Sequence, residues 1–284
     1  MVTGASLAAI TDAIAKTVVV TYPVVEVLFI RSLVAIVLIA AIAMARGKVH
    51  NLMPTRPVAQ IQRAIALGLA VFFFFTSLKY LPLADVTALF FAAPLMTTLL
   101  SIPLLGEKVG VHRLCAISVG LIGVFLVARP GSEITSWAAL LPIAAAFAFA
   151  LAMVATRKLT QTETSISQIA MATIVMIAGT IPFMPFVWIT PTIIDLAVMC
   201  GLGILSIAQH LAFVEAFRHA PVAVVAPFDY VAMVWAVLLG YLFWDEFPVP
   251  IVWGGIAIIV ASGLYVLYRE IRVSATPDPA VTHP

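Results

Sequence analysis

The chain carries one hydrophobic unit twice. Displacing the sequence by 139 positions brings Pro82 onto Pro221 and Glu107 onto Glu246. Seven of the 30 positions from 78 to 107 are then identical, and most of the others exchange one apolar residue for another. A unit that recurs at a fixed displacement predicts two copies of one structural element packed against each other.

The amino-acid composition indicates the environment in which these two units fold. The chain of 284 residues is 63% hydrophobic and only 10% charged, with a mean hydropathy of +1.16. Soluble domains carry about 25% charged residues. Lipid must therefore be the solvent. The net charge is only +2, and no basic run exists to bind nucleic acid. Cys115 and Cys200 lie inside apolar segments, which favours buried thiols over a disulfide framework.

Breaks at charged residues, prolines and glycines divide the chain into ten apolar segments. Each is close to the roughly 20 residues that a helix needs to cross a bilayer. The predicted spans are 3–22, 25–45, 62–80, 83–105, 112–129, 135–157, 166–189, 193–218, 222–244 and 250–269. The first segment lacks the basic start of a signal peptide, so it is predicted to be a retained helix. Residues 273–284, rich in Pro and Thr, are predicted to be a disordered tail.

Lysine and arginine positions predict the orientation. If the N-terminus is cytoplasmic, the outer loops hold only Lys79 and Arg129. Eleven basic residues then belong to the cytoplasmic side: Arg46, Lys48, Arg56, Arg63, Lys108, Arg113, Arg157, Lys158, Arg218, Arg269 and Arg272. This positive-inside bias places both termini in the cytoplasm.

Five spans per unit is an odd number, so the second unit must enter the membrane from the opposite side. The units, 3–130 and 135–270, are therefore predicted to be inverted repeats, with Glu107 and Glu246 on opposite sides of the bilayer. Such repeats typically form one site near the midplane, which rocking exposes to either side. This arrangement favours a secondary transporter that works by alternating access.

Charged residues inside the spans need a reason, because each costs roughly 2.5–3.5 kcal/mol at a helix centre. Asp12 and Lys16 are four residues apart and share one helix face. Six such residues gather in the outer half of the predicted bundle: Asp12, Lys16, Glu26, Arg31, Lys79 and Asp85. Pairs such as Asp12–Lys16 and Glu26–Arg31 either hold the bundle together or act as gates, and the sequence leaves both roles open.

Aromatic and polar residues of the fourth, eighth and ninth spans predict the lining of a cavity. Phe91 and Tyr230 are 139 residues apart and therefore equivalent in the two repeats. The predicted cavity residues are Thr87, Phe90, Phe91, Pro94, Thr97, His210, Asp229, Tyr230 and Trp235. A lone histidine such as His210 is more often a hydrogen-bonded interior residue than a proton carrier. Even so, His210 and Asp229 are the candidates for proton coupling.

Prolines and glycines complete the pattern. Pro94 and Pro227 remove backbone hydrogen bonds and are expected to kink the fourth and ninth spans. The carbonyls freed there either bind polar substrate groups or mark hinges. Gly120 with Gly123, and Gly254 with Gly255, give the fifth and tenth spans small faces, which favours a role in scaffolding or dimerisation.

Two stretches resemble the EamA domains of the drug/metabolite transporter superfamily. The first runs from Leu78-Lys-Tyr-Leu-Pro-Leu-Ala84 through Pro94 to Gly106-Glu107-Lys108 and Gly120-Leu-Ile-Gly-Val124. The second comprises Ala216-Phe-Arg-His-Ala-Pro-Val-Ala223, Ala226-Pro-Phe, Tyr230, Asp245-Glu246 and Ser262-Gly-Leu-Tyr265. Lys16 and Arg31 stand where this family often has basic residues.

The resemblance implies an all-α integral membrane protein of ten helices, with two inverted five-helix repeats around a central cavity. It also implies a bacterial inner-membrane location and export of aromatic or other neutral amino acids. Uptake of S-adenosylmethionine, riboflavin or another metabolite is the alternative. Asp245 replaces the glycine that the family often has before the glutamate, and the second repeat has Met153 and Ala172 where the first has Asp12 and Arg31. Gating is therefore expected to be asymmetric.

An intramembrane enzyme and a receptor are the remaining classes. The five histidines are scattered, and the sequence contains no HExxH zinc motif and no nucleophile motif. We therefore expect no enzymatic activity, no cofactor and no metal. The expected partners are a small-molecule substrate, the lipid bilayer and, if transport is coupled, protons. The sequence leaves monomer and homodimer open.

Overall fold

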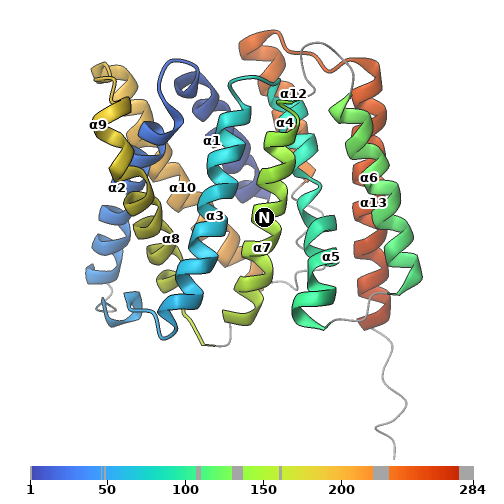
Figure 1. Ribbon diagram of the computed structural model, residues 1–284, viewed down its shortest axis with the longest axis horizontal. Coiled ribbons are helices and arrows are strands. Elements are labelled where there is room, and N and C mark those ends of the chain that lie inside the picture. Colours follow the sequence, from blue (N-terminus) through green and yellow to red (C-terminus); the bar gives the residue numbers. More distant parts are fainter. Residues whose placement is uncertain are drawn as a thin grey trace, which may run out of the picture.

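The computed structural model describes residues 2–45, 47, 49–106, 110–129, 137–159, 162–219 and 230–274. These residues form helices and connecting links, without a strand among them. Figure 1 shows a bundle in which most helices run between one upper and one lower end. Asp229, Glu107, Pro227 and the tail from 275 onward lie outside the described residues, whereas positions 273 and 274 belong to the last helix.

The first half of the chain supplies α1 (Val2–Val19), α2 (Val24–Ala45), η1 (Val49–Leu52), α3 (Pro57–Ser77), α4 (Leu83–Phe90), α5 (Ala93–Leu105) and α6 (Val111–Ala128). The second half supplies α7 (Leu140–Leu159), α8 (Ser165–Thr180), η2 (Ile181–Phe183), α9 (Met184–Val187), α10 (Ile193–His219), α12 (Val231–Trp244) and α13 (Pro250–Ser274).

The expected all-α membrane fold is confirmed. Within the described residues, seven segments are long and apolar enough to cross a bilayer, two of them near the N-terminus and one, Leu83–Leu105, built from α4 and α5 together. Three further apolar helices, Leu114–Ala128, Val231–Trp244 and Pro250–Val266, are shorter. The total of ten spans stays a prediction.

The links between helices gather at two ends. The upper end in Figure 1 holds four links: 20–23, 78–82, 188–192 and 245–249. Tyr22 and Glu246 of these links form hydrogen bonds with neighbouring segments there. Links 49–56 and 162–164 lie at the lower end and are joined by Thr55. The upper end corresponds to the predicted outer side, because it includes Lys79.

Several helix contacts occur in pairs that an exchange of the two halves would interchange. Helix α1 packs against α10, and its counterpart α7 packs against α3. Helix α2 packs against α10, while α8 packs against α3. Helices α6 and α13, predicted to be equivalent, pack directly against each other along the right side of Figure 1.

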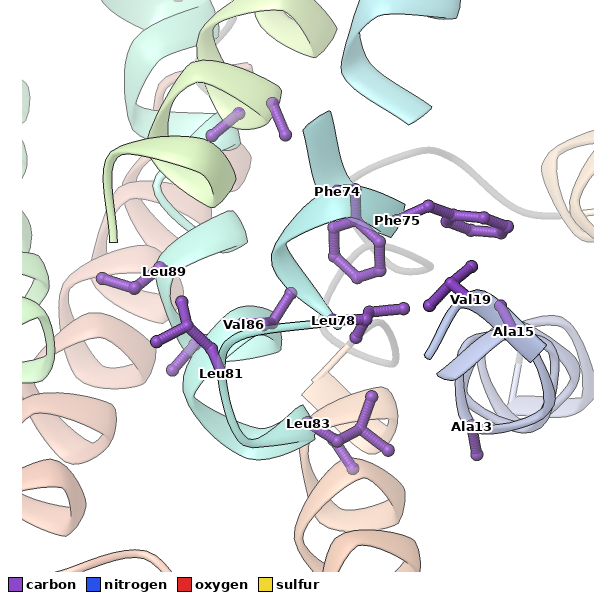
Figure 2. Packing of buried hydrophobic residues seen from close by; sticks show 14 of the residues in the cluster. Ala13, Ala15, Val19, Phe74, Phe75, Leu78, Leu81, Leu83, Val86 and Leu89 are labelled. Atoms are coloured by element: carbon purple, nitrogen blue, oxygen red, sulfur yellow. The ribbon is translucent and has the colours of Figure 1, made fainter. Parts of the chain in front are cut away.

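The apolar core is concentrated near the upper end. Leu78, in the link after α3, lies between Val86 of α4 and Val19 of α1, and Phe75 of α3 lies beside Val19 (Figure 2). All four are at most 3% exposed. Many large apolar side chains on the outside are exposed instead, with Phe186 at 85% and Ile193 at 88%. Exposed apolar surface of this extent would be untenable in water, but it suits a lipid environment.

Prolines explain where the helices depart from the predicted spans. Helix α3 begins at Pro57, five residues before the predicted 62, because proline lacks an N–H that the first helical turn does not need. Arg63 is consequently buried inside the helix and is not a loop residue as predicted. The seventh span is broken before α9, where Pro182 and Pro185 are each the second residue of a short helix, η2 and α9.

Candidate functional site

Phe91 and Tyr230, which the sequence displacement of 139 predicts to be equivalent, are in direct contact. Their ring centroids are 5.0 Å apart and their planes are inclined by 26°, so the rings are stacked. The Tyr230 hydroxyl lies against the Cα of Gly263 on α13, in the volume that a Cβ there would occupy. One aromatic ring from each half of the chain thus contacts the other, and α13 packs against the hydroxyl of Tyr230.

Phe90 points elsewhere, since neighbouring residues on a helix are about 100° apart. Its ring packs edge-on against Phe74 of α3, with centroids 5.0 Å apart, and against Phe149 of α7, with centroids 5.3 Å apart. Phe90 therefore joins an aromatic row that connects three helices. Its contacts are those of a packing residue.

The fourth span is interrupted at Phe91 and Ala92, so α4 ends at Phe90 and α5 begins at Ala93. Pro94 lies in the first turn of α5 and offers no N–H to the carbonyl of Phe90. The expected distortion at Pro94 is thus confirmed as a helix break. The Thr87 and Thr97 hydroxyls donate to Leu83 and Ala93 carbonyls, 2.8 Å away in each case.

Trp235 and His210 lie on different helices of the second half. The Trp235 indole N–H donates to Ser6 Oγ at 2.9 Å and so ties α12 to α1. His210 on α10 is exposed in the structure and lies within electrostatic range of Arg31 and Arg63. Asp229, the other candidate proton carrier, lies outside the described residues.

Lys16 pairs with Glu246 and not with Asp12. Its ammonium donates to the Glu246 carboxylate at 2.5 Å and to the Leu81 carbonyl at 3.1 Å. Glu246 also accepts from the Leu83 amide at 3.1 Å. Lys16 lies in the last turn of α1, and a long lysine near a helix end extends toward the interface where acceptors lie. These contacts form the upper latch, defined here as Lys16, Glu246, Leu81 and Leu83.

In the upper latch, the predicted gating residue Lys16 bonds directly to Glu246 in the opposite half of the chain. Trp244, at the end of α12, lies under the Lys16 ammonium with its ring centroid 5.2 Å away, a cation–π contact. Lys16 itself is 4% exposed. The latch therefore joins α1, the start of α4 and the link before α13 at the upper end.

Asp85 forms a second ion pair beside the latch. Arg129, at the end of α6, donates to the Asp85 carboxylate at 2.6 Å. The Asp85 side chain is 3% exposed and the Arg129 side chain 24%. Lys79, also predicted at a gate, has its ammonium 3.4 Å from the Tyr22 carbonyl. The Asp85 pair joins two helices of the same half.

Glu26 is not paired with Arg31. One oxygen of the fully buried Glu26 carboxylate accepts from the Ile189 amide at 3.0 Å, across the link between α9 and α10. Tyr22 makes a parallel connection, because its hydroxyl donates to Asp195 at 2.7 Å. This bond to Asp195 raises the pKa of the Tyr22 hydroxyl above its ordinary value. Glu26 thus fastens α2 to the second half through the backbone.

Arg63 anchors the lower end, a role the sequence did not reveal. Its guanidinium donates to the Gln168 carbonyl on α8 at 2.5 Å and to Thr156 Oγ1 on α7 at 3.4 Å. It is 5% exposed. A loop assignment concealed it, and the only available signal was Pro57 as a helix start.

Glu163 completes this lower anchor. Its carboxylate accepts from Thr55 Oγ1 and the Arg56 amide, both at 2.7 Å, and from Ser167 Oγ at 3.3 Å. Burial alone would raise its pKa, but the donors at Thr55 and Arg56 outweigh that effect and lower the pKa below the ordinary 4.5. The lower clamp, defined here as Arg63, Glu163 and their partners, joins α3 and its preceding link to α7 and α8.

A groove of about 470 Å³ lies away from these clusters, between α6 and α13. It is lined by Val111, Cys115, Ala116, Val119, Ala261, Ser262 and Tyr265. Its apolar walls belong to the two helices that pack against each other through glycines, where a Cβ on Gly123 would lie 2.9 Å from the Gly255 carbonyl. This contact agrees with the expected scaffolding role of both helices.

The apolar helices, the exposed apolar surface and the buried ion pairs describe an all-α multi-pass membrane protein. The sequence profile of the EamA-like transporter family matches residues 1–129 and 136–268. The chain therefore belongs to the EamA-like transporter family, within the drug/metabolite transporter superfamily.

Three bacterial relatives illustrate the range of substrates. The chain is 28% identical over 249 residues to the S-adenosylmethionine uptake transporter of Rickettsia bellii, covering 86% of this chain and 84% of that protein. It is 28% identical to the riboflavin transporter of Rhizobium johnstonii, covering 78% and 74%. It is 27% identical to the pseudopaline exporter CntI of Pseudomonas aeruginosa, covering 88% of each.

A solved crystal structure has the same fold. It superposes with a TM-score of 0.65 over 94% of this chain and 98% of its own, at 19% sequence identity. This likeness concerns the fold alone.

Proposed function

We propose that the protein is a secondary transporter that moves small zwitterionic or amphipathic metabolites by alternating access. Export of neutral and aromatic amino acids across a bacterial inner membrane is the main hypothesis. The observation that carries it is the stacked Phe91–Tyr230 pair, in which equivalent positions of the two repeats meet. A substrate site on the pseudo-symmetry axis is typical of transporters built from inverted repeats.

Inverted repeats at 3–130 and 135–270 are part of this proposal. The paired helix contacts support it, since α1 with α10 corresponds to α7 with α3. The two separate matches to the EamA family support it as well. In this arrangement, rocking of the halves would open the upper and lower ends in turn.

The ion pairs at the upper end support the proposal that this end is the closed one. The upper latch joins α1 of the first half to the link before α13 of the second half. Opening the upper end requires separation of Lys16 from Glu246, after which water can solvate both groups. We therefore assign gating to Lys16 with Glu246, and the positive-inside bias supports assigning this end to the outer side of the membrane.

The substrates named for the relatives guide the choice of compounds for a transport test. Methionine is the amino-acid part of S-adenosylmethionine, which the rickettsial relatives take up. Phenylalanine and threonine represent aromatic and neutral amino acids. Riboflavin has a large aromatic ring system and no α-amino acid group. Uptake of S-adenosylmethionine or riboflavin is the second candidate function, supported by the names of these relatives.

A counterflow experiment tests the proposal. Liposomes that contain the purified protein and one unlabelled compound should take up the same compound in labelled form faster than protein-containing liposomes without that compound. We expect this for at least one of five compounds: methionine, phenylalanine, threonine, S-adenosylmethionine and riboflavin. Phe91→Ala should lower that rate by about tenfold or more, since a lost aromatic contact costs on the order of 1.5 kcal/mol or more. Phe125→Ala is the matched control, because Phe125 on α6 is 64% exposed.

Two outcomes would contradict the proposal. Absence of counterflow for the whole panel, with the protein verified as folded and inserted, contradicts a carrier for these metabolites. Equal loss of flux in Phe91→Ala and Phe125→Ala contradicts the proposed position of the site. Flux measured in vesicles sorted by orientation then separates export from uptake.

A further inference from the structure

Two opposite charges in the bundle, Asp12 and Arg31, form no ion pair among the residues that the structure describes. Asp12 of α1 makes no hydrogen bond or ion pair within the part of the chain that the structure describes. Arg31 of α2 contacts the Phe75 ring, with its guanidinium carbon 5.3 Å from the ring centroid, and likewise forms no ion pair among these residues. Both side chains are only partly buried. Charges in a span are normally paired, so this arrangement needs an explanation.

The two groups are near each other and at matched depth. Their charges interact electrostatically, although they are not in contact. Asp12 precedes the end of α1 by seven residues, and Arg31 follows the start of α2 by seven. At 1.5 Å per residue, each lies about 10 Å below the upper helix ends. That depth is roughly a third of the way across a hydrocarbon core of about 30 Å.

Packing holds Arg31 in place. Gly203 of α10 lies against the backbone of α2, where an added Cβ would be 2.7 Å from the Arg31 carbonyl and 2.8 Å from Val34 Cβ. The Phe75 ring contacts the guanidinium on another side. His210 and Arg63 add positive or polar character, because His210 interacts electrostatically with both arginines. The Arg31 side of the pair therefore has a positive field, and the Asp12 side a negative one.

We propose that Asp12 and Arg31 bind the charged groups of an α-amino acid, and so determine specificity for zwitterionic substrates. The substrate carboxylate bonds to the Arg31 guanidinium, whose planar fork suits bidentate contact with a carboxylate. The substrate ammonium bonds to the Asp12 carboxylate. A zwitterion neutralises both protein charges at once, which neither an amine nor a carboxylic acid alone can do.

This inference rests on the proposed transport function and specifies its substrate class. It also replaces the expected gating role of both residues. Lys16 and Glu246 carry the upper latch, whereas Asp12 and Arg31 lie about one helical turn deeper than Lys16.

The test compares three probes that share one side chain. Binding of L-methionine, L-methionine methyl ester and 4-(methylthio)butanoate is measured on the full-length protein in nanodiscs. The ester lacks the anionic carboxylate, and the butanoate lacks the ammonium. Wild-type protein should prefer methionine to each analogue by about 10- to 100-fold, the range expected for a hydrogen bond to a charged group.

Each variant should lose one preference and keep the other. Arg31→Gln should bring methionine and its methyl ester within about threefold of each other, while discrimination against the butanoate persists. Asp12→Asn should show the reverse pattern. Arg31→Lys, which keeps the charge without the fork, should fall between wild type and Arg31→Gln. Ratios of probes on one sample are unaffected by the fraction of active protein.

Matched controls remove one charge of the same type elsewhere. Arg157→Gln changes an exposed arginine near the end of α7, and Asp245→Asn changes an exposed aspartate at the upper end. Both should retain the wild-type ratios. Wild-type protein that does not bind L-methionine, or variants that keep both preferences, overturn the inference. Counterflow of riboflavin without inhibition by methionine also overturns it, yet leaves the transport proposal intact.

Discussion

The upper latch and the lower clamp both connect the halves of the chain, but they use different chemistry. The latch depends on one charge pair, Lys16 with Glu246, helped by single backbone groups of Leu81 and Leu83. The clamp spreads its bonds over several neutral partners. Arg63 reaches the Gln168 carbonyl, and Glu163 accepts from Thr55 and the Arg56 amide.

This difference teaches which end can open at low cost. When a charge pair separates into water, hydration replaces most of the lost attraction, so the net free energy of the pair is small. A buried arginine that leaves a backbone carbonyl exposes a group that must find a new partner in a confined place. The latch therefore suits a gate, and the clamp suits a fixed connection about which the halves turn.

The largest effect is expected from Glu246→Gln, which leaves Lys16 buried at 4% exposure without its anion. Breaking a buried pair costs about 3 kcal/mol, so the upper end should open about 100-fold more often. A Thr87→Cys reporter, in a chain with Cys115→Ser and Cys200→Ser, should react correspondingly faster with an impermeant maleimide. The charge exchange Lys16→Glu with Glu246→Lys should restore protection. Unchanged labelling would show that the latch does not close this end.

Arg129→Gln sharpens the comparison, because its ion pair with Asp85 lies within one half. The variant leaves a carboxylate that is 3% exposed, and Lys16 compensates in part because it also interacts with Asp85. We expect a loss of about 2.5 kcal/mol in stability, measured as a lower thermal midpoint in detergent. Labelling of the Thr87→Cys reporter should change far less than in Glu246→Gln. Equal labelling in both variants would contradict the distinction between pairs within and between halves.

Arg63→Met tests the clamp. Methionine fills a similar volume but leaves the Gln168 carbonyl without its charged donor, which should cost about 2 kcal/mol. The thermal midpoint should fall while the upper end stays protected. Arg157→Met is the control, since Arg157 is exposed and should shift the midpoint little. If Arg63→Met exposes the Thr87→Cys reporter as strongly as Glu246→Gln does, the two clusters are not independent.

The smallest effect is expected from Glu163→Gln, which removes the charged acceptor of the clamp at a cost of about 1 kcal/mol at pH 7. Because the folded pKa of Glu163 lies below the ordinary 4.5, its contribution is fully present above pH 4.5 and is lost as the pH falls through the folded pKa. Thermal midpoints of wild type and variant should therefore converge only below pH 4.5. A difference that is constant down to pH 3 would assign the effect to packing.

The sequence predicted the parts of this molecule that depend on periodicity and repetition. Where the structure describes both ends, hydrophobic segments located the helices to within about five residues, and the displacement of 139 matched Phe91 with Tyr230, whose rings the structure stacks. Pro94 marked the break between α4 and α5 for a local reason, the missing N–H.

Side-chain partners were predicted less well. Helix spacing joined Lys16 to Asp12, but spacing along one helix says nothing about acceptors that another link brings to the same interface. Glu246 is 230 residues from Lys16, and only folding brings them together. The sequence assigned Glu26 to Arg31 for the same reason, whereas a backbone amide at Ile189 is the actual partner. Arg63 was missed because the start of α3 was placed too late.

The contact between Tyr230 and Gly263 has a consequence for how this protein can diversify. Tyr230 touches Phe91 with its ring and the tenth-span backbone with its hydroxyl. A methyl group introduced by Gly263→Ala would displace that hydroxyl, and the ring would have to tilt against Phe91. Under the proposed function, a single added carbon at Gly263 would alter substrate preference indirectly, through the position of the Tyr230 ring.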